Sequence, residues 1–379
     1  MKILVLGAGL VGRPMAIDLA MDKNFDVAVT DLRKTNLDKL PSDLPIKKIE
    51  MDITDHKALH SLVKDFEIVV NAVPGFMGFS TLKEIINAGK NIVDISFFSE
   101  DPFELDELAK QNNVTAIVDC GIAPGMSNIL IGKADKVLDK TETVLIYVGG
   151  LPAIRELPYE YKAGFSPIDV IEEYTRPAKY IENGKMVVRP ALSDPELMNF
   201  PGIGTLEAFN SDGLRTLAVT LDAPNMKEKT LRYPGHIEKI LLLRESGFFS
   251  KDEIDVNGVK IAPVDFTSKL LFPLWEMKDG DADFTIMKVI IEGTKDNKKL
   301  RYTYDLFDRH NEDTKIHSMA RTTGYTATSV VRLLAANQFN RKGICPPEYI
   351  GQQSGCAEFI LNCLKERGVI YRQTIETLG

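Results

Sequence analysis

A glycine-rich segment near the amino terminus has the spacing of a dinucleotide-binding turn. Gly7, Gly9 and Gly12 follow a short apolar run and precede a segment with helical spacing. In such a turn the first glycine permits the bend, the second lets backbone N–H groups approach a pyrophosphate, and the third lets helix and strand pack closely. Leu10 and Val11 lie between these glycines and share the predicted contact. A glycine turn that binds no ligand is the alternative.

An acidic residue follows at the distance that this kind of site requires. Asp31 ends the second apolar run, about twenty residues beyond Gly12, where a carboxylate can accept hydrogen bonds from the adenosine ribose. Leu32 belongs to the same predicted contact. The carboxylate of Asp31 would repel a 2′-phosphate, whereas Arg33 nearby could bind one. We therefore expect NAD as the cofactor, with NADP as the alternative.

Three further strand ends should line the same crevice, because ligands gather at the carboxyl ends of parallel strands. The pair Asp52 and Ile53 is expected beside adenine. The run 71–74 is expected near the nicotinamide ribose, and Asp94 and Ser96 beyond it. The predicted cofactor contacts are Asp52, Ile53, Asn71, Ala72, Val73, Pro74, Asp94 and Ser96. For Asp52 the competing interpretation is a helix cap, since a helical segment follows at once.

The first part of the chain alternates short apolar runs with helical patterns. The runs are 2–6, 26–30, 46–50, 67–73, 91–95 and 114–118, and the helical segments are 14–21, 56–64, 78–88 and 102–112. This rhythm is typical of βαβ units, with helices covering both faces of a parallel sheet. We expect an α/β fold with a Rossmann-type doubly wound sheet, in a dinucleotide-binding domain over residues 1–122.

The pattern changes after residue 122. Longer strand-like runs at 142–149, 216–221, 284–293 and 299–306 are joined by loops rich in Pro and Gly, and the turn-prone segment 295–297 predicts an antiparallel hairpin. Residues 123–316 are therefore expected to form an inserted α+β domain for substrate binding and dimerisation. Helices at 319–336 and 354–367 are expected to return to the first domain as residues 317–379, although they could instead belong to the second.

Composition narrows the class of protein. The formal net charge of −8, with scattered basic residues, argues against nucleic acid, and the absence of a long apolar window argues against a membrane span. The amino terminus lacks a signal-peptide pattern, and the four cysteines lack zinc-site spacing, so we expect no metal. These features favour a cytoplasmic enzyme that acts on a small molecule as a homodimer or a dimer of dimers.

Several motifs occur in an order that resembles the saccharopine dehydrogenase family, and within it the L-lysine 6-dehydrogenase branch. The resemblance covers nearly the whole chain. Its specific part includes Gly-Ile-Ala-Pro-Gly-Met-Ser-Asn-Ile-Leu from residue 121 and Glu-Tyr-Thr-Arg-Pro-Ala from residue 173. The motif segments are 71–75, 119–128, 147–152, 173–178, 207–209, 211–214 and 230–236.

The resemblance implies NAD-dependent oxidation of the lysine ε-carbon. The iminium takes up water, ammonia leaves, and the 2-aminoadipate 6-semialdehyde cyclises to piperideine-6-carboxylate. A base or a desolvating pocket must first produce free amine, because the ε-ammonium has a pKa near 10.4. The alternatives are a saccharopine or carboxynorspermidine dehydrogenase of the same family, or a non-catalytic NAD-binding protein.

Five residues are the candidates for this chemistry. Asp119, which ends the last strand of the first domain, and Glu207 and His236, which lie in matched motifs, are the acid–base candidates. Arg215 and Arg232 are the candidates for holding a substrate carboxylate. The alternatives are a surface carboxylate or salt bridge for Glu207, a helix cap for His236, and a surface arginine for either guanidinium.

Overall fold

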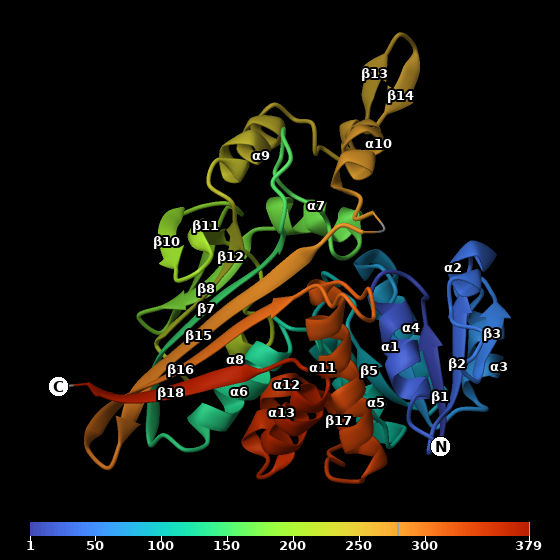
Figure 1. Cartoon of the computed structure of the whole chain (residues 1–379), viewed down its shortest axis with the longest axis horizontal. Helices are drawn as coiled ribbons and strands as arrows, with labels where there is room; N and C mark the ends of the chain where they lie inside the picture. The colour runs from blue at the N-terminus through green and yellow to red at the C-terminus, as the bar shows by residue number, and fades with distance from the viewer. Residues whose placement is uncertain (279, 379) are drawn as a thin grey trace. The chain divides into compact units, whose positions relative to one another are not determined.

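The protein folds into two compact units, each described by itself. The computed structural model describes residues 1–278 and 280–378 (Figure 1). The first unit contains Met1–Asp139 and Met319–Tyr371, and the second contains Lys140–Ser318 and the chain from Arg372 on. The first unit thus extends beyond the expected boundary at residue 122, and the last residues lie with the second unit.

The first unit is built on a parallel sheet of seven described strands in the order β17-β6-β5-β4-β1-β2-β3. This order, with the reversal beside β1, is that of a doubly wound Rossmann-type sheet and confirms the predicted fold class. Sequence patterns missed only the three-residue strand β17. The strands are β1 (Lys2–Leu6), β2 (Asp26–Asp31), β3 (Ile46–Glu50), β4 (Ile68–Asn71), β5 (Asn91–Asp94), β6 (Thr115–Ile117) and β17 (Gly343–Cys345).

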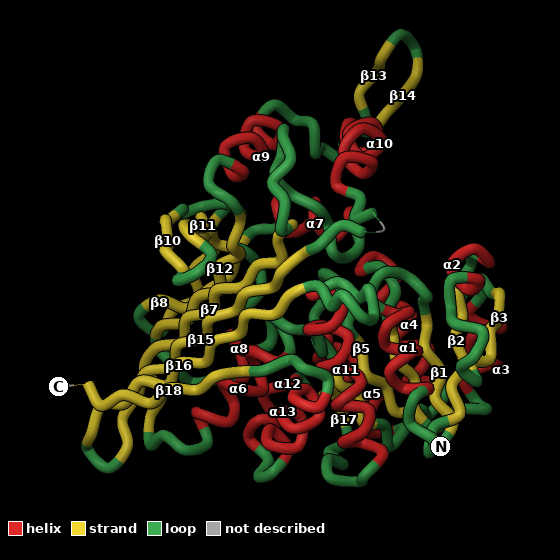
Figure 2. The backbone as a smooth tube through the Cα atoms, viewed as in Figure 1, coloured by secondary structure: helices red, strands yellow, loops and turns green. Residues whose placement is uncertain are grey.

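Helices follow most of these strands, as Figure 2 shows in red. The central strands are apolar runs because both of their faces are covered; all four residues of β4 are buried. The helices of this unit up to residue 139 are α1 (Gly12–Ala20), α2 (Lys34–Asp38), α3 (His56–Val63), α4 (Gly75–Asn87), the 3₁₀ turn η1 (Pro102–Leu105), α5 (Asp106–Gln111) and α6 (Met126–Asp135).

The carboxyl-terminal helices α11 (Ser318–Ala335), α12 (Pro347–Gln352) and α13 (Cys356–Glu366) also belong to this unit, apart from Ser318. One buried carboxylate on α1 joins α11 and the end of α13 to that helix. Asp18 accepts hydrogen bonds from Thr328 Oγ1 at 2.5 Å, Arg332 Nη1 at 2.7 Å and Arg367 Nε at 2.6 Å. Because removing one partner from a buried ion pair costs about 3–5 kcal/mol, Asp18 fixes these helices firmly on the dinucleotide-binding unit.

The second unit contains a mixed sheet of nine described strands. Its main order is β10-β11-β12-β7-β15-β16-β18, with β8 pairing both β12 and β9. Only β12 and β7, among the pairs whose register is described, run parallel. The strands are β7 (Lys140–Pro152), β8 (Ala178–Glu182), β9 (Lys185–Arg189), β10 (Glu196–Phe200), β11 (Gly204–Asn210), β12 (Asn225–Arg232), β15 (Asp283–Lys295), β16 (Lys298–Arg309) and β18 (Tyr371–Leu378).

The predicted antiparallel hairpin is present between β15 and β16. Lys295 pairs with Lys298, and the two residues between them, Asp296 and Asn297, have φ of 50° and 61°. Positive φ at both central residues is the signature of a type I′ turn, which Asp and Asn tolerate better than most residues.

The strand expected at 216–221 is wrong, because this segment forms the short helix α8 (Leu217–Thr220). Arg215 has a φ of 50°, which turns the chain, and Thr220 N donates to Thr216 O at 3.0 Å. Leu217 is fully buried whereas Val219 is 69% exposed. In a strand these two side chains would share a face, so the difference fits a helical turn and not a half-buried strand.

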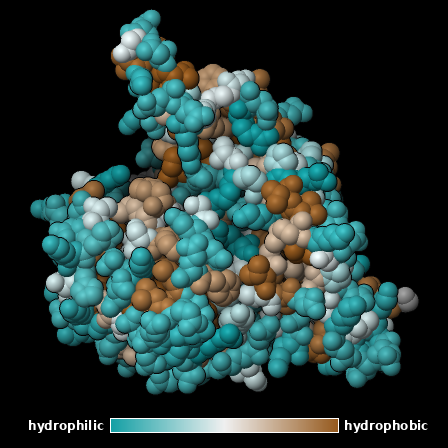
Figure 3. Space-filling model, turned by 180° about the vertical axis from the view of Figure 1, so that it is seen from behind, coloured by the Kyte–Doolittle hydropathy of each residue, from teal (hydrophilic) through white to brown (hydrophobic). Residues whose placement is uncertain are grey.

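Three longer helices, α7 (Pro167–Thr175), α9 (His236–Glu245) and α10 (Pro263–Trp275), complete the second unit with the small hairpin of β13 (Ile254–Val256) and β14 (Val259–Ile261). Trp275 is fully buried and forms edge-to-face contacts with Tyr159, Tyr161 and Tyr174. The hairpin stands out in Figure 3, with brown apolar residues at its base.

The described residues meet neither the requirements for a membrane-spanning helix nor those for a metal site of three or more side chains. None of its helices combines the length and the apolarity needed to cross a bilayer. Across residues 1–278 and 280–378, no group of three or more His, Cys, Asp or Glu side chains is placed to hold a metal ion.

Candidate functional site

The glycine turn of the first unit is shaped by close backbone contacts. Gly7 has a φ of 96°, and its N–H donates to Thr30 O at 2.8 Å. A Cβ on Gly12 would lie 2.0 Å from the Gly7 carbonyl oxygen, so only glycine fits there. A Cβ on Gly9, in contrast, would meet no described atom within 4 Å. The backbone at Gly9 therefore borders open space, which a ligand can approach.

The start of α1 suits an anion. Val11 is the N-cap residue of this nine-residue helix, and its apolar side chain makes no capping hydrogen bond to the first backbone N–H groups. Uncapped N–H groups and the helix dipole together favour a negatively charged group at such a helix start. A pyrophosphate fits this arrangement, held by the backbone from Gly9 to Gly12, so the sequence-predicted contacts at Leu10 and Val11 lie in the same turn.

Asp31 is tied to this turn. Its Oδ2 accepts from Ala8 N at 2.8 Å and its Oδ1 from Arg33 N at 2.8 Å, while Asn36 Nδ2 lies 3.2 Å from both oxygens. These contacts hold the carboxylate against the loop after β1, and the contact of Asp31 with a ribose stays a prediction. Leu32, the next residue, is 63% exposed.

The ends of β4 and β5 form a buried polar group. Asn71 Nδ2 donates to Asp94 Oδ2 at 2.9 Å, and Ser96 N donates to Asp94 Oδ1 at 2.6 Å. Burial, strengthened by the nearby Asp119, raises the pKa of Asp94 to about 7, against the lowering effect of the hydrogen bonds from Asn71 and Ser96. Asn71 Oδ1 is buried and makes no hydrogen bond to a described atom. Three of the residues predicted to contact the cofactor, Asn71, Asp94 and Ser96, therefore lie together.

The loop after β4 lies against the glycine turn. Ala72 N donates to Leu6 O at 2.9 Å, and a Cβ on Gly7 would lie 2.7 Å from Ala72 O. Val73 is buried, and Pro74 is the N-cap residue of α4. The predicted run 71–74 thus borders the turn.

Asp52 does not cap a helix. Its Oδ1 accepts from Thr54 N at 2.9 Å and from Thr54 Oγ1 at 2.7 Å, and these bonds lower its pKa. The cap of α3 is Asp55, which accepts from Lys57 N and Ala58 N. The competing interpretation of Asp52 is therefore wrong, and its predicted contact with adenine stays a prediction, as does that of the buried Ile53.

Asp119 lies just beyond β6 and is 2% exposed, with a φ of 51°. This left-handed conformation, which Asp tolerates better than most residues, turns the chain into the loop before α6. The neighbouring Cys120 is buried, and burial raises the pKa of its thiol far above the usual range. A thiol of this kind is unreactive, consistent with a packing role for Cys120.

In the second unit, a buried guanidinium organises the polar side chains. Arg232, at the end of β12, is 3% exposed. Its Nη2 donates to Glu173 Oε2 at 2.7 Å, its Nε donates to Tyr174 OH at 3.1 Å, and its guanidinium lies 4.6 Å from the centroid of the Tyr161 ring. Arg232 is thus not a surface arginine, and its donors and its face are largely engaged within the unit.

His236 is the first residue of α9 and points into the same cluster. It is 1% exposed, with Nε2 lying 2.9 Å from Tyr174 OH and Nδ1 lying 2.9 Å from Tyr159 O. Because a carbonyl only accepts, Nδ1 carries the hydrogen. Burial, together with the charge of Arg232, lowers the pKa of His236 to about 3, so the ring is neutral and Nε2 accepts from Tyr174. The alternative of a helix cap is wrong, because the N-cap is Gly235.

Glu207 lies on β11 directly opposite Arg232 on β12. Its Oε2 accepts from Gly235 N at 3.1 Å, which places the carboxylate at the start of α9. Two of the acid–base candidates therefore meet the start of α9: Glu207 through Gly235 N, and His236 as the first residue of the helix. Asp119 belongs to the other unit.

Arg215 lies in the loop before α8, partly buried. Its charge acts on Arg176, whose pKa is lowered first by burial and then by Arg215. Arg176 Nη1 lies 3.8 Å from Asp212 Oδ2 and Arg176 Nη2 lies 3.9 Å from Glu172 Oε2. The structure thus groups two guanidiniums with carboxylates beside the Arg232 cluster, and one of them, Arg176, was not predicted as a site residue.

A second buried carboxyl group adjoins this cluster. Glu228, on β12, is 4% exposed, and Ser211 Oγ lies 2.6 Å from its Oε2. Burial raises the pKa of Glu228 to about 8, and the nearby Glu173 and Asp212 add to this rise. Sequence reasoning gave no role to Glu173, Tyr174 or Glu228. The alternation of Glu228, Thr230 and Arg232 on one strand would have signalled a shared polar face.

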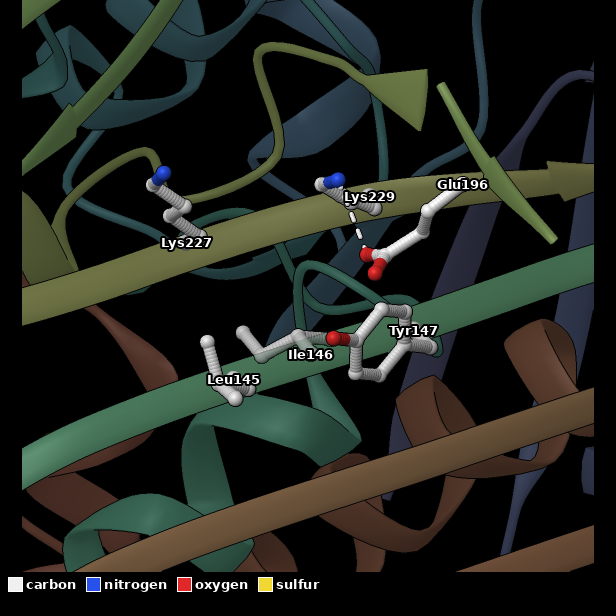
Figure 4. Close-up of a pocket in the computed structure, with 6 residues that line it drawn as sticks. All are labelled: Leu145, Ile146, Tyr147, Glu196, Lys227 and Lys229. Atoms are coloured by element: carbon white, nitrogen blue, oxygen red, sulfur yellow. Dashed lines mark ion pairs between the residues drawn. The ribbon is translucent and has the colours of Figure 1, made fainter. Parts of the chain in front are cut away.

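The other face of β12 carries Lys227 and Lys229, beside a cavity of about 190 Å³ (Figure 4). Lys229 and Glu196 point toward one another, with their charged atoms 2.8 Å apart, and Lys227 Nζ lies 4.5 Å from the centroid of the Tyr180 ring. Burial, with a further effect of Glu196, raises the pKa of Tyr147 to about 12. The charges on this face are thus largely engaged within the sheet.

Comparison with known proteins gives a consistent set of relatives. Saccharopine dehydrogenase [NADP(+), L-glutamate-forming] from Pyricularia oryzae is 26% identical over 79% of this chain and 69% of its own length. Alpha-aminoadipic semialdehyde synthase from Bos taurus is 27% identical over 66% of this chain, but the match spans only 29% of that longer protein. Carboxyaminopropylagmatine dehydrogenase from a Synechocystis strain is 20% identical over 90% of this chain.

A solved structure supports the fold. The apo saccharopine dehydrogenase (L-Glu forming) from Saccharomyces cerevisiae superposes with a TM-score of 0.79 at 20% identity, over 100% of both chains. Residues 3–117 match the family described as saccharopine dehydrogenase NADP binding domain, and residues 121–369 match the saccharopine dehydrogenase C-terminal domain. Together these two matches account for nearly the whole sequence, and the chain belongs to the saccharopine dehydrogenase family.

Proposed function

We propose that this chain is an NAD-dependent oxidoreductase that deaminates L-lysine at its ε-carbon. The observation that carries the proposal is the position of Asp31, whose carboxylate accepts from Ala8 N at 2.8 Å and so lies on the glycine turn. A bound nicotinamide dinucleotide would supply the hydride acceptor. The ε-carbon then loses a hydride, the iminium takes up water, and ammonia leaves with formation of the semialdehyde.

NAD is favoured over NADP on electrostatic grounds. A carboxylate at the end of β2 accepts hydrogen bonds from ribose hydroxyls but repels a 2′-phosphate. The matched domain family and several relatives carry NADP in their names, and the exposed Arg33 offers a guanidinium for such a phosphate. We give more weight to Asp31, because its two backbone hydrogen bonds hold it on the turn.

Lysine presents one carboxylate and two amino groups, so its site needs cationic side chains for the carboxylate and acidic side chains for the amino groups. We assign the substrate carboxylate to Arg176 and Arg215, and we assign Arg232 a positioning role because its contacts with Glu173, Tyr174 and Tyr161 engage it. Asp212, which lies 3.8 Å from Arg176, and Glu173, which lies 2.7 Å from Arg232, supply the acidic groups that favour an ammonium. Saccharopine carries more carboxylates and would need more cations.

Removal of a proton from the ε-ammonium requires a base, since its pKa lies near 10.4 in water. Asp119 and Glu207 remain our candidates for this step and for activating the attacking water. His236 instead holds the Tyr174 hydroxyl, because its two ring nitrogens are engaged by Tyr174 and Tyr159. We therefore place His236 with Arg232 among the positioning residues.

The proposal is tested by incubating the purified chain with NAD or NADP and one amine at a time, and following absorbance of the reduced dinucleotide. The panel contains L-lysine, ornithine, saccharopine, carboxynorspermidine and carboxyaminopropylagmatine. We expect the highest kcat/KM with L-lysine and NAD, with ammonia released in equal amount. Faster turnover of saccharopine or a polyamine precursor would move the chain to another branch of its family, and binding of NAD without any reduction would indicate a non-catalytic protein.

A further inference from the structure

Four side chains in the second unit form an unbroken line of short oxygen–oxygen contacts. Glu228 Oε2 lies 2.6 Å from Ser211 Oγ, Ser211 Oγ lies 2.7 Å from Thr230 Oγ1, and Thr230 Oγ1 lies 2.8 Å from Glu173 Oε1. All three separations are hydrogen-bond lengths. Glu228, Ser211 and Thr230 are each at most 4% exposed, so the contacts are shielded from water.

The two hydroxyl groups in this line do not carry enough hydrogens for its three contacts. Three hydrogen bonds need three hydrogens, but the hydroxyl groups of Ser211 and Thr230 supply only one each. If both carboxyl groups were ionised, one of the three contacts would place two electron-rich oxygens against each other without a hydrogen. A buried contact of that kind is unfavourable. One of the two carboxyl groups, Glu228 or Glu173, must therefore supply the third hydrogen.

The surroundings identify which carboxyl group holds the proton. Glu173 lies 2.7 Å from the guanidinium of Arg232, which favours its ionised form. Two charged groups that act on Glu228 are Glu173 from α7 and Asp212 from the loop after β11, and both are acidic. Arg176 Nη1 lies 3.8 Å from Asp212 Oδ2. The N–H of Gly213 favours the ionised form of Glu228, but burial outweighs it.

We propose that Glu228 is a neutral carboxylic acid in the working protein. Its O–H donates a hydrogen bond to Ser211 Oγ, Ser211 donates to Thr230, and Thr230 donates to Glu173. The line of donors then ends on the carboxylate that binds Arg232, which in turn donates to Tyr174. Glu228 is thus a positioning residue for the Arg232 cluster. Its part in the reaction depends on the proposed function, whereas its protonation does not.

A protonated Glu228 makes the free energy of unfolding fall as pH rises. The folded-state pKa of Glu228 is raised to about 8, above that of an unfolded glutamate. Below the unfolded value both states hold the proton, and its contribution to stability is complete. Between the two values only the folded state holds it, so stability falls as pH rises and levels off above the folded pKa. The fall is at most about tenfold in the folded-to-unfolded ratio per pH unit.

Infrared spectroscopy of the intact protein tests the protonation directly. Near pH 6.5 the wild type should show the carbonyl band of a buried carboxylic acid, shifted in heavy water, which is absent from Glu228→Gln and present in the control Glu182→Gln. Asp94 is a second buried acid with a raised pKa, and Asp94→Asn identifies its band. Absence of any band that disappears in Glu228→Gln would overturn the proposal, whether or not the protein turns over lysine.

Denaturation as a function of pH provides a second test. The amide of Glu228→Gln can donate to Ser211 at every pH, so the variant should lose less stability than the wild type between about pH 5 and 8. Its kcat should also hold above pH 8, where that of the wild type falls. Parallel stability profiles in wild type and variant would show that Glu228 is already ionised in the folded protein, and the inference would be wrong.

Discussion

The glycine turn and the Arg232 cluster differ in how they are built. The turn consists of consecutive backbone groups, from Gly7 to Gly12, to which one distant carboxylate is added. The Arg232 cluster consists of side chains from α7, β12 and α9, joined by hydrogen bonds between residues about sixty positions apart. A site made of local backbone tolerates almost no side-chain change at its glycines, whereas a site made of side chains depends on every partner to keep its buried charges paired.

The largest effect is expected in the Arg232 cluster. Arg232→Met leaves Glu173 without its buried partner, so we expect a loss of about 3–5 kcal/mol in the free energy of unfolding. Denaturant unfolding measures it. The double variant Glu173→Gln/Arg232→Met removes both charges and should recover much of this loss. If the single and double variants were equally stable, the ion pair would not be what holds the cluster.

The glycine turn offers a matched pair of substitutions. Gly12→Ala places a methyl group 2.0 Å from the Gly7 carbonyl oxygen, so it should destabilise the first unit by about 1–3 kcal/mol and abolish NAD binding. Gly9→Ala meets no described atom within 4 Å and should leave stability unchanged. It should still weaken NAD, because the methyl group occupies the space where the pyrophosphate approaches. Calorimetric titration with NAD that is unaffected by Gly9→Ala would remove Gly9 from the binding turn.

Glu207→Gln tests the acid–base assignment. Its amide oxygen can still accept from Gly235 N, so the fold and NAD binding should persist, while kcat falls at least about a hundredfold, the usual scale for a lost acid–base group. The matched control is Glu196→Gln, on the strand next to β11, which should keep its activity. Near-normal turnover of Glu207→Gln would leave Asp119 as the remaining candidate base.

The smallest effect concerns cofactor choice. Asp31→Ser removes a charge from the ribose position, and NAD should then lose about tenfold in affinity relative to NADP, which corresponds to about 1.4 kcal/mol. Titration of both dinucleotides measures the ratio. An unchanged ratio would mean that Asp31 only braces the loop through Ala8 N and does not select the cofactor.

The features that could be predicted from the sequence are those built from neighbouring residues, like the glycine turn. The parallel strands, the glycine turn and Asp31 were predictable, because periodicity and local spacing encode them. The helix α8 was mistaken for a strand, because the run from Thr216 to Leu221 is apolar and short, and only the tertiary contacts of Leu217 decide its form. The strand β17 was missed because three residues carry no detectable period.

The contacts within the Arg232 cluster of the second unit could not be predicted from the sequence. Arg232 and His236 were singled out from their motifs, but their partners Glu173 and Tyr174 lie about sixty residues away, and no local rule links them. Burial also changed the expected role of His236, since a histidine with both nitrogens engaged is poorly suited to exchange protons with a substrate. The homodimer, the cytoplasmic location and the choice of base stay predictions.

The most direct test of the central claim follows the hydride itself. L-Lysine carrying two deuterium atoms on its ε-carbon is incubated with NAD and the purified chain, and the reduced dinucleotide is examined by mass spectrometry and NMR. The account predicts one deuterium per molecule of NADH at C4 of the nicotinamide, with release of ammonia and formation of a monodeuterated piperideine-6-carboxylate. NADH without deuterium, or no NADH in a protein that still binds NAD, would contradict it.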